Sequence, residues 1–171
     1  QREVELGARD GLLRVEVGDE IVVVERDILQ HHALALIEAG EIARRLAATF
    51  GARVEERAGA IEVVEPMAIP IGDFTLVEEL LINLVDNALN YSRPDVPPHI
   101  RIASEELGAV VRLSVADNGV GIPAEQRERI FEVFTRLPGV GEDKGTGIGL
   151  AIVRKAARSM GSDVTIDSVV G

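Results

Sequence analysis

The most regular hydrophobic pattern in the chain runs from about Asp73 to Tyr91. Apolar residues recur there at intervals of three and four positions, which places them on one face of a helix. They are Val77, Leu80, Leu81, Leu84, Val85, Ala88 and Leu89. Asp73 or Thr75 is expected to cap this helix, and Thr75 with Glu78 fits a capping box. The proline-rich residues 94–98 then end it.

The chain before this helix is less regular. The Ala-rich stretch Asp27–Phe50 has apolar residues at helical spacing and predicts helix, which Gly40 would divide in two and Gly51 would cap at its C-terminus. Two short strands are predicted to follow, at Arg53–Glu56 and Ile61–Glu65.

The remaining elements mix strands and helices without regular alternation. Near the N-terminus, residues 12–17 and 21–24 flank a Gly-Asp pair and predict a small hairpin. Further strands are predicted at His99–Ser104, Ala109–Ala116 and Val164–Asp167, and helices at Ala124–Arg129 and Gly147–Met160. This order favours an α+β fold over a doubly wound sheet.

Composition narrows the class of protein. The chain has 171 residues, 46% of them hydrophobic, which suits one domain with a sizeable core. With 18 basic and 29 acidic residues the net charge is 18 − 29 = −11, which argues against nucleic acid or an anionic membrane surface as a partner. The absence of cysteine excludes disulfides, Cys-ligated metals and a Cys nucleophile. No apolar run reaches the ~20 residues of a membrane helix, and the first residue, Gln1, indicates a piece of a longer protein.

A polar stripe lies on the regular helix. Glu79, Asn83, Asn87 and Asn90 follow one another at steps of four, four and three, which puts them on one face. Asparagine is a mediocre helix former, because its amide competes for backbone hydrogen bonds. The stripe is therefore either a solvated face or a set of ligands, and carboxamide oxygens suit Mg²⁺.

Two glycine-bearing loops are the other candidates for a site. Asp117–Gly121 follows a predicted strand, and it is either a plain turn or part of a ligand site. In a ligand site, the carboxylate of Asp117 would accept a hydrogen bond from a ligand amine, and the glycines would allow the ligand to approach closely. Gly145–Leu150 opens the last predicted helix, where free N–H groups suit phosphate. The second loop lacks the Lys-Ser/Thr of a Walker A loop and the βαβ unit of a dinucleotide fold.

Four blocks together resemble the ATP-binding catalytic domain of bacterial sensor histidine kinases. Residues 83–92 are similar to the N box of this family, residues 117–123 to its G1 box, residues 131–137 to its F box and residues 145–153 to its G2 box. Ile71–Asp73, ahead of the helix, also fits. The Phe-x-Arg-Leu form of the F box and the compact lid are most similar to those of phytochrome-type kinases.

The resemblance implies the Bergerat fold, a two-layer α/β sandwich with a mixed sheet, helices on one face and a glycine-rich ATP lid. We expect residues 40–171 to form this catalytic domain without its last strand, and residues 1–39 to be a lead segment to which no role is assigned. The lid would span Ile122–Thr146 and be anchored by Phe131 and Phe134.

The resemblance also implies roles for single residues. Asn87 would coordinate an Mg²⁺ ion that bridges the phosphates, with Asn83 supporting it, and these two are the expected catalytic residues. Asp117 would bind the adenine amine, and Tyr91 would pack on the ring. The residues expected to contact ATP are Asn87, Asn90, Tyr91, Asp117, Gly119, Gly121, Ile122, Phe134, Arg136, Lys144, Gly145, Thr146, Gly147, Gly149 and Leu150.

Asn83 bears on the reaction. Related Bergerat ATPases place a glutamate one turn before the magnesium asparagine, where it activates water as a general base. An amide has no useful basicity, so the sequence favours phosphoryl transfer to a protein. The expected acceptor is a histidine on the dimerisation helices of a homodimeric parent protein, which then passes the group to an aspartate in the receiver domain of a response regulator. This domain is expected in the cytoplasm, and the parent is either soluble or membrane-anchored.

Two departures from the family keep other functions open. Asn90 stands where the family usually has Lys or Arg, and no histidine has the surroundings of a phosphoacceptor. His31 and His32 lack the acidic residue and proline that follow the acceptor in the family, and His99 is expected to be structural. The alternatives are a degenerate module that binds nucleotide or a partner without transfer, a Bergerat-type ATPase, and a serine kinase of the anti-sigma type.

Overall fold

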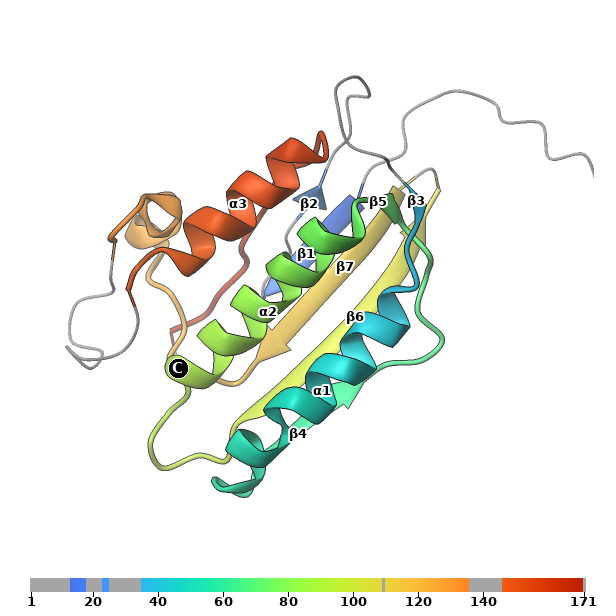
Figure 1. Cartoon of the computed structure of the whole chain (residues 1–171). Helices are drawn as coiled ribbons and strands as arrows, with labels where there is room; N and C mark the ends of the chain where they lie inside the picture. Colours follow the sequence, from blue (N-terminus) through green and yellow to red (C-terminus); the bar gives the residue numbers. More distant parts are fainter. Residues whose placement is uncertain (1–12, 18–22, 25–34, 109, 136–145, 171) are drawn as a thin grey trace, which may run out of the picture.

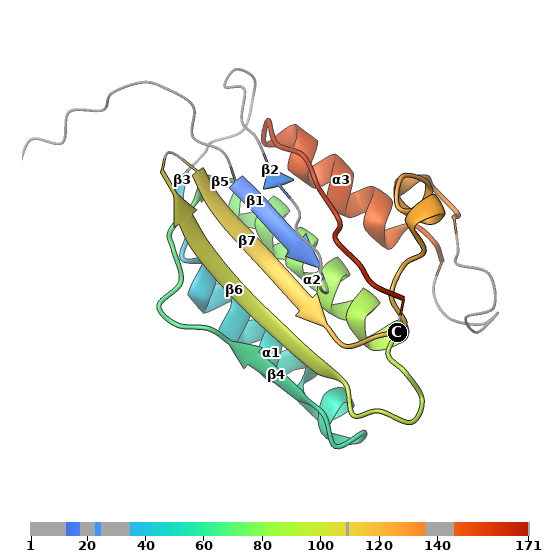
Figure 2. The same cartoon turned by 180° about the vertical axis from the view of Figure 1, so that it is seen from behind.

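The protein folds into two layers, a mixed sheet and a layer of helices. A computed structural model describes residues 13–17, 23–24, 35–108, 110–135 and 146–170. The sheet has the strand order β2-β1-β7-β6-β4. Figure 1 shows the helices on one face of it, and the view from behind in Figure 2 shows the opposite face without them. This arrangement confirms the predicted α+β two-layer sandwich.

The elements have the following bounds. The sheet contains β1 (Leu13–Val17), β2 (Val23–Val24), β4 (Ala60–Val63), β6 (His99–Leu107) and β7 (Val110–Asp117), and a separate pair contains β3 (Ala35–Leu36) and β5 (Ile71–Gly72). The helices are α1 (Ala39–Glu55), α2 (Phe74–Asn90) and α3 (Gly149–Ser159), with 3₁₀ turns η1 (Ala124–Gln126) and η2 (Arg129–Phe131).

The sheet is mixed because two of its pairings are parallel and two antiparallel. β1 runs parallel to β7 and β4 parallel to β6, whereas β6–β7 and β1–β2 are antiparallel. The predicted hairpin near the N-terminus is thus present. Its first strand also pairs with β7 from Leu13↔Val111 to Val17↔Val115, so part of residues 1–39 lies within the sheet.

The core lies between α2 and the two central strands. All seven apolar residues predicted to line one face of α2 are buried. On the sheet side, Ile100 and Ile102 of β6 and Leu113 and Val115 of β7 are fully buried and alternate with more exposed residues, as a sheet covered on one face requires. At the start of α2 the carboxylate of Asp73, rather than Thr75, provides the cap by accepting a hydrogen bond from the Leu76 N–H (3.0 Å).

The predictions before α2 were partly wrong. Residues 27–34 lie outside the described part of the chain, and Ala35–Leu36 form β3 instead of helix. Helix α1 contains Gly40 in its first turn and runs through Gly51 without stopping. The strand predicted at Arg53–Glu56 is the end of this helix, because Val54 continues the buried face that includes Phe50 four residues earlier.

Two predictions near the C-terminus also differ from the structure. The segment predicted as a helix at Ala124–Arg129 consists of the 3₁₀ turns η1 and η2. Val164–Asp167 was predicted to be a strand, but it is not part of a strand. The segment that follows it instead makes hydrogen bonds to the loop after β7.

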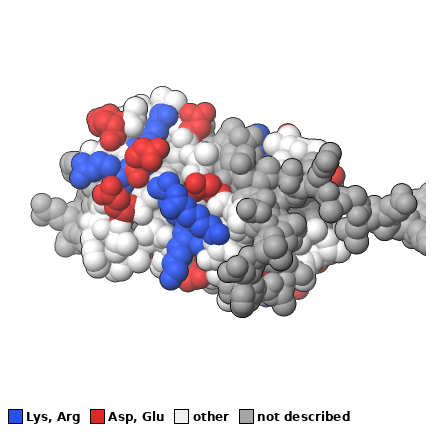
Figure 3. Space-filling view, turned by 90° about the horizontal axis from the view of Figure 1, so that it is seen from above, with Lys and Arg blue, Asp and Glu red and all other residues white. Residues whose placement is uncertain are grey.

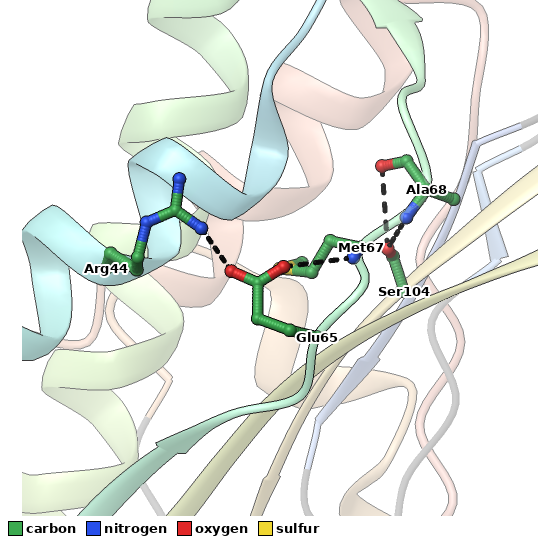
Figure 4. A network of polar contacts seen from close by, with 5 residues as sticks. All are labelled: Arg44, Glu65, Met67, Ala68 and Ser104. Atoms are coloured by element: carbon green, nitrogen blue, oxygen red, sulfur yellow. Dashed lines mark hydrogen bonds and ion pairs between the residues drawn. The ribbon is translucent and has the colours of Figure 1, made fainter.

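Ion pairs and hydrogen bonds tie the helices to their surroundings. Arg44 of α1 pairs with Glu65, whose other carboxylate oxygen accepts from the Met67 N–H (3.3 Å). Beside it the Ala68 N–H donates to the hydroxyl of Ser104 on β6 (2.6 Å), as Figure 4 shows. Because Arg44 and Glu65 are about half exposed, their pair contributes little to stability but orients the loop that leads to α2.

Helices α1 and α2 are bridged in the same way. Arg45 pairs with Glu78 and lies over the ring of Phe74, and Arg53 pairs with Asp86 at 2.8 Å. Viewed from the top of the molecule, acidic and basic side chains lie next to one another rather than in separate patches (Figure 3). Within the described residues, none of the helices combines the length and the apolar character that crossing a membrane requires.

Two adjacent residues of α2 test this packing. Leu81 is fully buried and Ile82 is 38% exposed. Leu81→Ala is expected to lower the free energy of unfolding by about 2–5 kcal/mol, because it leaves a cavity against the sheet. Ile82→Ala should lower it by less than about 1 kcal/mol. Urea unfolding followed by circular dichroism measures both, and equal losses would contradict the assigned helix face.

Candidate functional site

A cavity of about 330 Å³ lies where α2 ends and α3 begins. In Figure 1 the end of α2, the end of β7 and the start of α3 meet at the lower left. Most of the residues predicted for the site line it: Asn83, Asn87, Asn90, Tyr91, Asp117, Gly119, Gly121, Ile122, Thr146, Gly147, Gly149 and Leu150. The three asparagines of the polar stripe and both glycine loops therefore face one space, whereas Glu79 does not line it.

The asparagines of α2 face the N-terminus of α3. A Cβ atom on Gly149 would lie 3.3 Å from Oδ1 of Asn83 and 3.5 Å from Oδ1 of Asn87. Asn83 also donates through Nδ2 to the carbonyl of Glu79 (2.8 Å), which fixes its amide. The N-cap of α3 is Ile148, whose side chain cannot accept hydrogen bonds from the first turn of the helix. Amide oxygens opposite the positive end of a helix suit a hard cation together with phosphate oxygens.

The loop after β7 is pressed against the end of α2. The Gly119 N–H donates to Oδ1 of Asp117 (2.7 Å), and the Val120 N–H donates to the carbonyl of Tyr91 (3.1 Å). A Cβ on Gly119 would lie 2.8 Å from that carbonyl oxygen, closer than real Cβ contacts allow. Glycine is thus required at 119, and the carboxylate of Asp117, which lines the cavity, is held by this loop.

The other side of this loop is held by the C-terminal segment, which the sequence did not single out. The buried Ser168 accepts a hydrogen bond from the Ile122 N–H (2.8 Å), and its carbonyl accepts one from Arg127. Gly121 has φ +72°, and a Cβ there would collide with the backbone of Val169. Val169 itself lines the cavity, so this segment forms one of its walls.

The lid predictions are confirmed only in part. Phe131 packs against the core, with Arg154 over its ring at 5.0 Å. Phe134 does not act as an anchor and does not line the cavity: its side chain is 74% exposed. It contributes through its backbone instead, since its N–H donates to the carbonyl of Gly147 (2.8 Å). Phe134 and Gly147 both have positive φ, +67° and +70°. The two residues therefore join through a specific backbone conformation at the base of the lid.

Three predicted residues, Arg136, Lys144 and Gly145, lie outside the described residues and remain predictions. Asn90 lines the cavity, but its amide donates to the carboxylate of Asp86 (2.8 Å). Because Asp86 in turn pairs with Arg53, Asn90 belongs to a polar chain that leads away from the cavity toward α1.

Comparison with known proteins fits this geometry. Residues 72–171 match the family model described as histidine kinase-, DNA gyrase B- and HSP90-like ATPases. The chain belongs to this family. Membership implies that ATP is the ligand of the domain, and the matched residues include both glycine loops and the whole of α2.

Individual relatives include a phytochrome-like protein and a sensory kinase. Phytochrome-like protein Cph1 of Synechocystis is 30% identical over 153 residues, which are 90% of this chain and 20% of that protein. Adaptive-response sensory kinase SasA of Rippkaea orientalis is 36% identical over 106 residues, 61% of this chain and 27% of that one. The chain thus spans about a fifth to a quarter of the length of these relatives.

Solved structures agree with the fold. The catalytic domain of histidine kinase ThkA superposes with a TM-score of 0.63 at 26% sequence identity. The similarity covers 81% of this chain and 96% of that domain.

Two glycines with nearly the same φ test the tight wall of the cavity. Gly108 has φ +69° and nothing near its Cβ position, whereas Gly121 has φ +72° and meets Val169. Each change to alanine should lower the free energy of unfolding by about 1 kcal/mol or more, because of the left-handed backbone. Only Gly121→Ala should also weaken binding of an ATP analogue, by at least about tenfold or ~1.4 kcal/mol.

Isothermal titration calorimetry measures the affinity, with Gly108→Ala as the matched control. Equal affinities for the two variants would mean that the wall formed by Val169 does not shape the nucleotide site.

Proposed function

We propose that this chain is the Mg²⁺·ATP-binding catalytic domain of a two-component sensor histidine kinase. The observation that carries the proposal is the set of groups that line one cavity. Asp117 lines it, and so do Asn83 and Asn87, which face the start of α3. A carboxylate can accept a hydrogen bond from the adenine amine, and amides can hold a metal beside phosphate, so this set suits bound ATP.

Each element of the site would act on a different part of the nucleotide. The start of α3 offers N–H groups and a positive dipole end to the phosphates. Asn87, with Asn83 one turn before it, would hold the Mg²⁺ ion, which neutralises phosphate charge when it is bound. Tyr91, which is partly exposed and lines the cavity beside Asp117, would pack on the base.

Asn83 supports transfer over hydrolysis. Its side chain is an amide held by the carbonyl of Glu79, and it cannot take a proton from water. Catalysis would then rest on positioning the γ-phosphoryl group and stabilising its charge, as in other phosphoryl transfers. The nucleophile would be a histidine on dimerisation helices of the homodimeric parent, and the final acceptor an aspartate in the receiver domain of a response regulator. The domain would act in the cytoplasm, with the parent either soluble or membrane-anchored.

The acceptor histidine would come from another part of the parent protein. His99 is exposed at the start of β6 and lies 4.0 Å from Glu62, and it does not line the cavity. His31 and His32 lie outside the described residues. The similarity covers only 20% of Cph1 and 27% of the sensory kinase SasA, which leaves room for such a domain in a longer parent.

One observation favours a second candidate, a module that binds nucleotide without transfer. Asn90 stands where the family usually has a basic residue, and its amide is occupied by Asp86. A phosphate contact would then be missing. Incubation of the parent protein with γ-labelled ATP separates the two functions: a kinase acquires label that is stable to alkali and labile to acid, as a phosphoramidate is, whereas the module acquires none.

Substitution of Asn83 tests the choice between transfer and hydrolysis. Asn83→Glu places a general base one turn before Asn87 and is expected to raise phosphate release from ATP by at least about tenfold. Asn83→Gln has the same length without the basicity and should leave release at the level of the unmodified chain. A phosphate-release assay measures all three proteins. Rapid hydrolysis by the unmodified chain would contradict the kinase assignment and favour an ATPase.

A further inference from the structure

Arg93, which follows the end of α2, was not among the predicted site residues, but it makes a hydrogen bond to one of them. Its Nε donates a hydrogen bond to the carbonyl of Gly119 (2.8 Å), across 26 residues of sequence. Arg93 also lines the cavity and is only partly exposed. The carbonyl that it holds lies two residues beyond Asp117, the residue assigned to the adenine amine.

The contact matters because it completes the fixation of one peptide unit. The carbonyl of Gly119 and the N–H of Val120 belong to the same planar peptide. Arg93 donates to the carbonyl, and the N–H donates to the carbonyl of Tyr91 (3.1 Å). Both polar groups of this unit are therefore bound to the segment that ends α2. Because its carbonyl and its N–H are both held, this peptide plane cannot rotate about the line that joins the Cα atoms of Gly119 and Val120.

The two hydrogen bonds restrain the loop at Gly119, where its backbone would otherwise have the most conformational freedom. Gly119 has no Cβ and therefore has more backbone conformations open to it than any other residue type. Its N–H, on the preceding peptide unit, donates to Oδ1 of Asp117 (2.7 Å). Without the bond from Arg93, the φ and ψ of Gly119 would be less restricted, so that the peptide units on both sides of it could shift and this hydrogen bond would weaken. The bond from Arg93 thus helps to set the direction of the Asp117 carboxylate.

The backbone of Arg93 is itself held in place by a residue of the turn that follows α1. Arg57, in the turn between α1 and β4, donates to the carbonyl of Arg93 (2.5 Å) and to the hydroxyl of Ser92. Ser92 is 5% exposed and donates to the carbonyl of Leu89 (2.6 Å), within the last turn of α2. The backbone at 92–93 is therefore fixed, and the Arg93 side chain leaves it in a defined direction.

We propose that Arg93 is a positioning residue for recognition of the adenine 6-amino group: it fixes the Gly119–Val120 peptide and so aims the Asp117 carboxylate. The inference rests on the proposed function, in which Asp117 accepts a hydrogen bond from that amine. It predicts that loss of the Arg93 donor reduces discrimination between a base with the amine and one without it.

Calorimetric titration with two ligands tests this on the unmodified chain and on Arg93→Met. The ligands are ATP and purine riboside triphosphate, which lacks the 6-amino group. Methionine keeps much of the length of the side chain and removes the donor. We expect affinity for ATP to fall about tenfold and affinity for the purine analogue to fall by much less, so that the ratio of the two affinities drops several-fold.

The ratio separates positioning from other effects of the change. Loss of a positive charge near the cavity, or a general loosening of the fold, would weaken both triphosphates equally and leave the ratio unchanged. Arg93→Lys retains a charged donor and should restore part of the ratio. Arg101→Met is the matched control, because Arg101 lies on the exposed side of β6 beside Glu62 (3.8 Å), and it should behave like the unmodified chain.

Two results would overturn the proposal, and they are distinguishable. If the unmodified chain discriminates between the ligands and Arg93→Met does so equally well, Arg93 has no positioning role while the adenine assignment stands. If the unmodified chain itself binds both ligands equally, Asp117 does not read the amine, and the inference fails together with that part of the proposed function.

Discussion

The burial of one face of α2 in the core between helices and sheet determines where the asparagines of the site lie. Leu80, Leu81 and Leu84 are fully buried in this core, so the helix cannot rotate about its axis without exposing them. At about 25 cal/mol per Å² of apolar surface, exposing even one such side chain costs more than a hydrogen bond returns. The opposite side of the helix is thereby fixed, and Asn83 and Asn87 are held opposite Gly149.

The rest of the cavity is built by backbone segments that approach this helix closely. Gly119 touches the carbonyl of Tyr91, Gly121 touches Val169, and Gly149 faces the asparagines. The approaches of Gly119 and Gly121 depend on a missing Cβ, and hydrogen bonds with residues distant in sequence secure this loop. Glycine gives the room, and Arg93 and Ser168 remove the freedom that glycine would otherwise leave. The glycine loop after β7 is therefore ordered by neighbours that lie outside the loop.

The sequence allowed prediction of α2, its cap region, the β6–β7 hairpin and half of the residues that line the cavity, because these depend on local periodicity or on short motifs. It did not predict Ser168 or Arg93, whose partners lie 46 and 26 positions away, since no local pattern encodes a contact between loops. Arg53–Glu56 was mistaken for a strand because a short stretch with one buried valine fits both periods. The side chain of Phe134 was expected to anchor the lid, but it is largely exposed, and the residue has a positive φ that no sequence pattern indicates.

The central claim is that one cavity binds adenine at Asp117 and magnesium at Asn87. Calorimetric titration with a non-hydrolysable ATP analogue, with and without Mg²⁺, tests both halves in the unmodified chain, Asp117→Ala, Asn87→Ala and the control Asp163→Ala, whose carboxylate pairs with Arg158 instead. The account predicts binding that Mg²⁺ strengthens at least about tenfold, loss of binding in Asp117→Ala and loss of the Mg²⁺ effect alone in Asn87→Ala. Binding that neither substitution changes, or no binding by the unmodified chain, would contradict it.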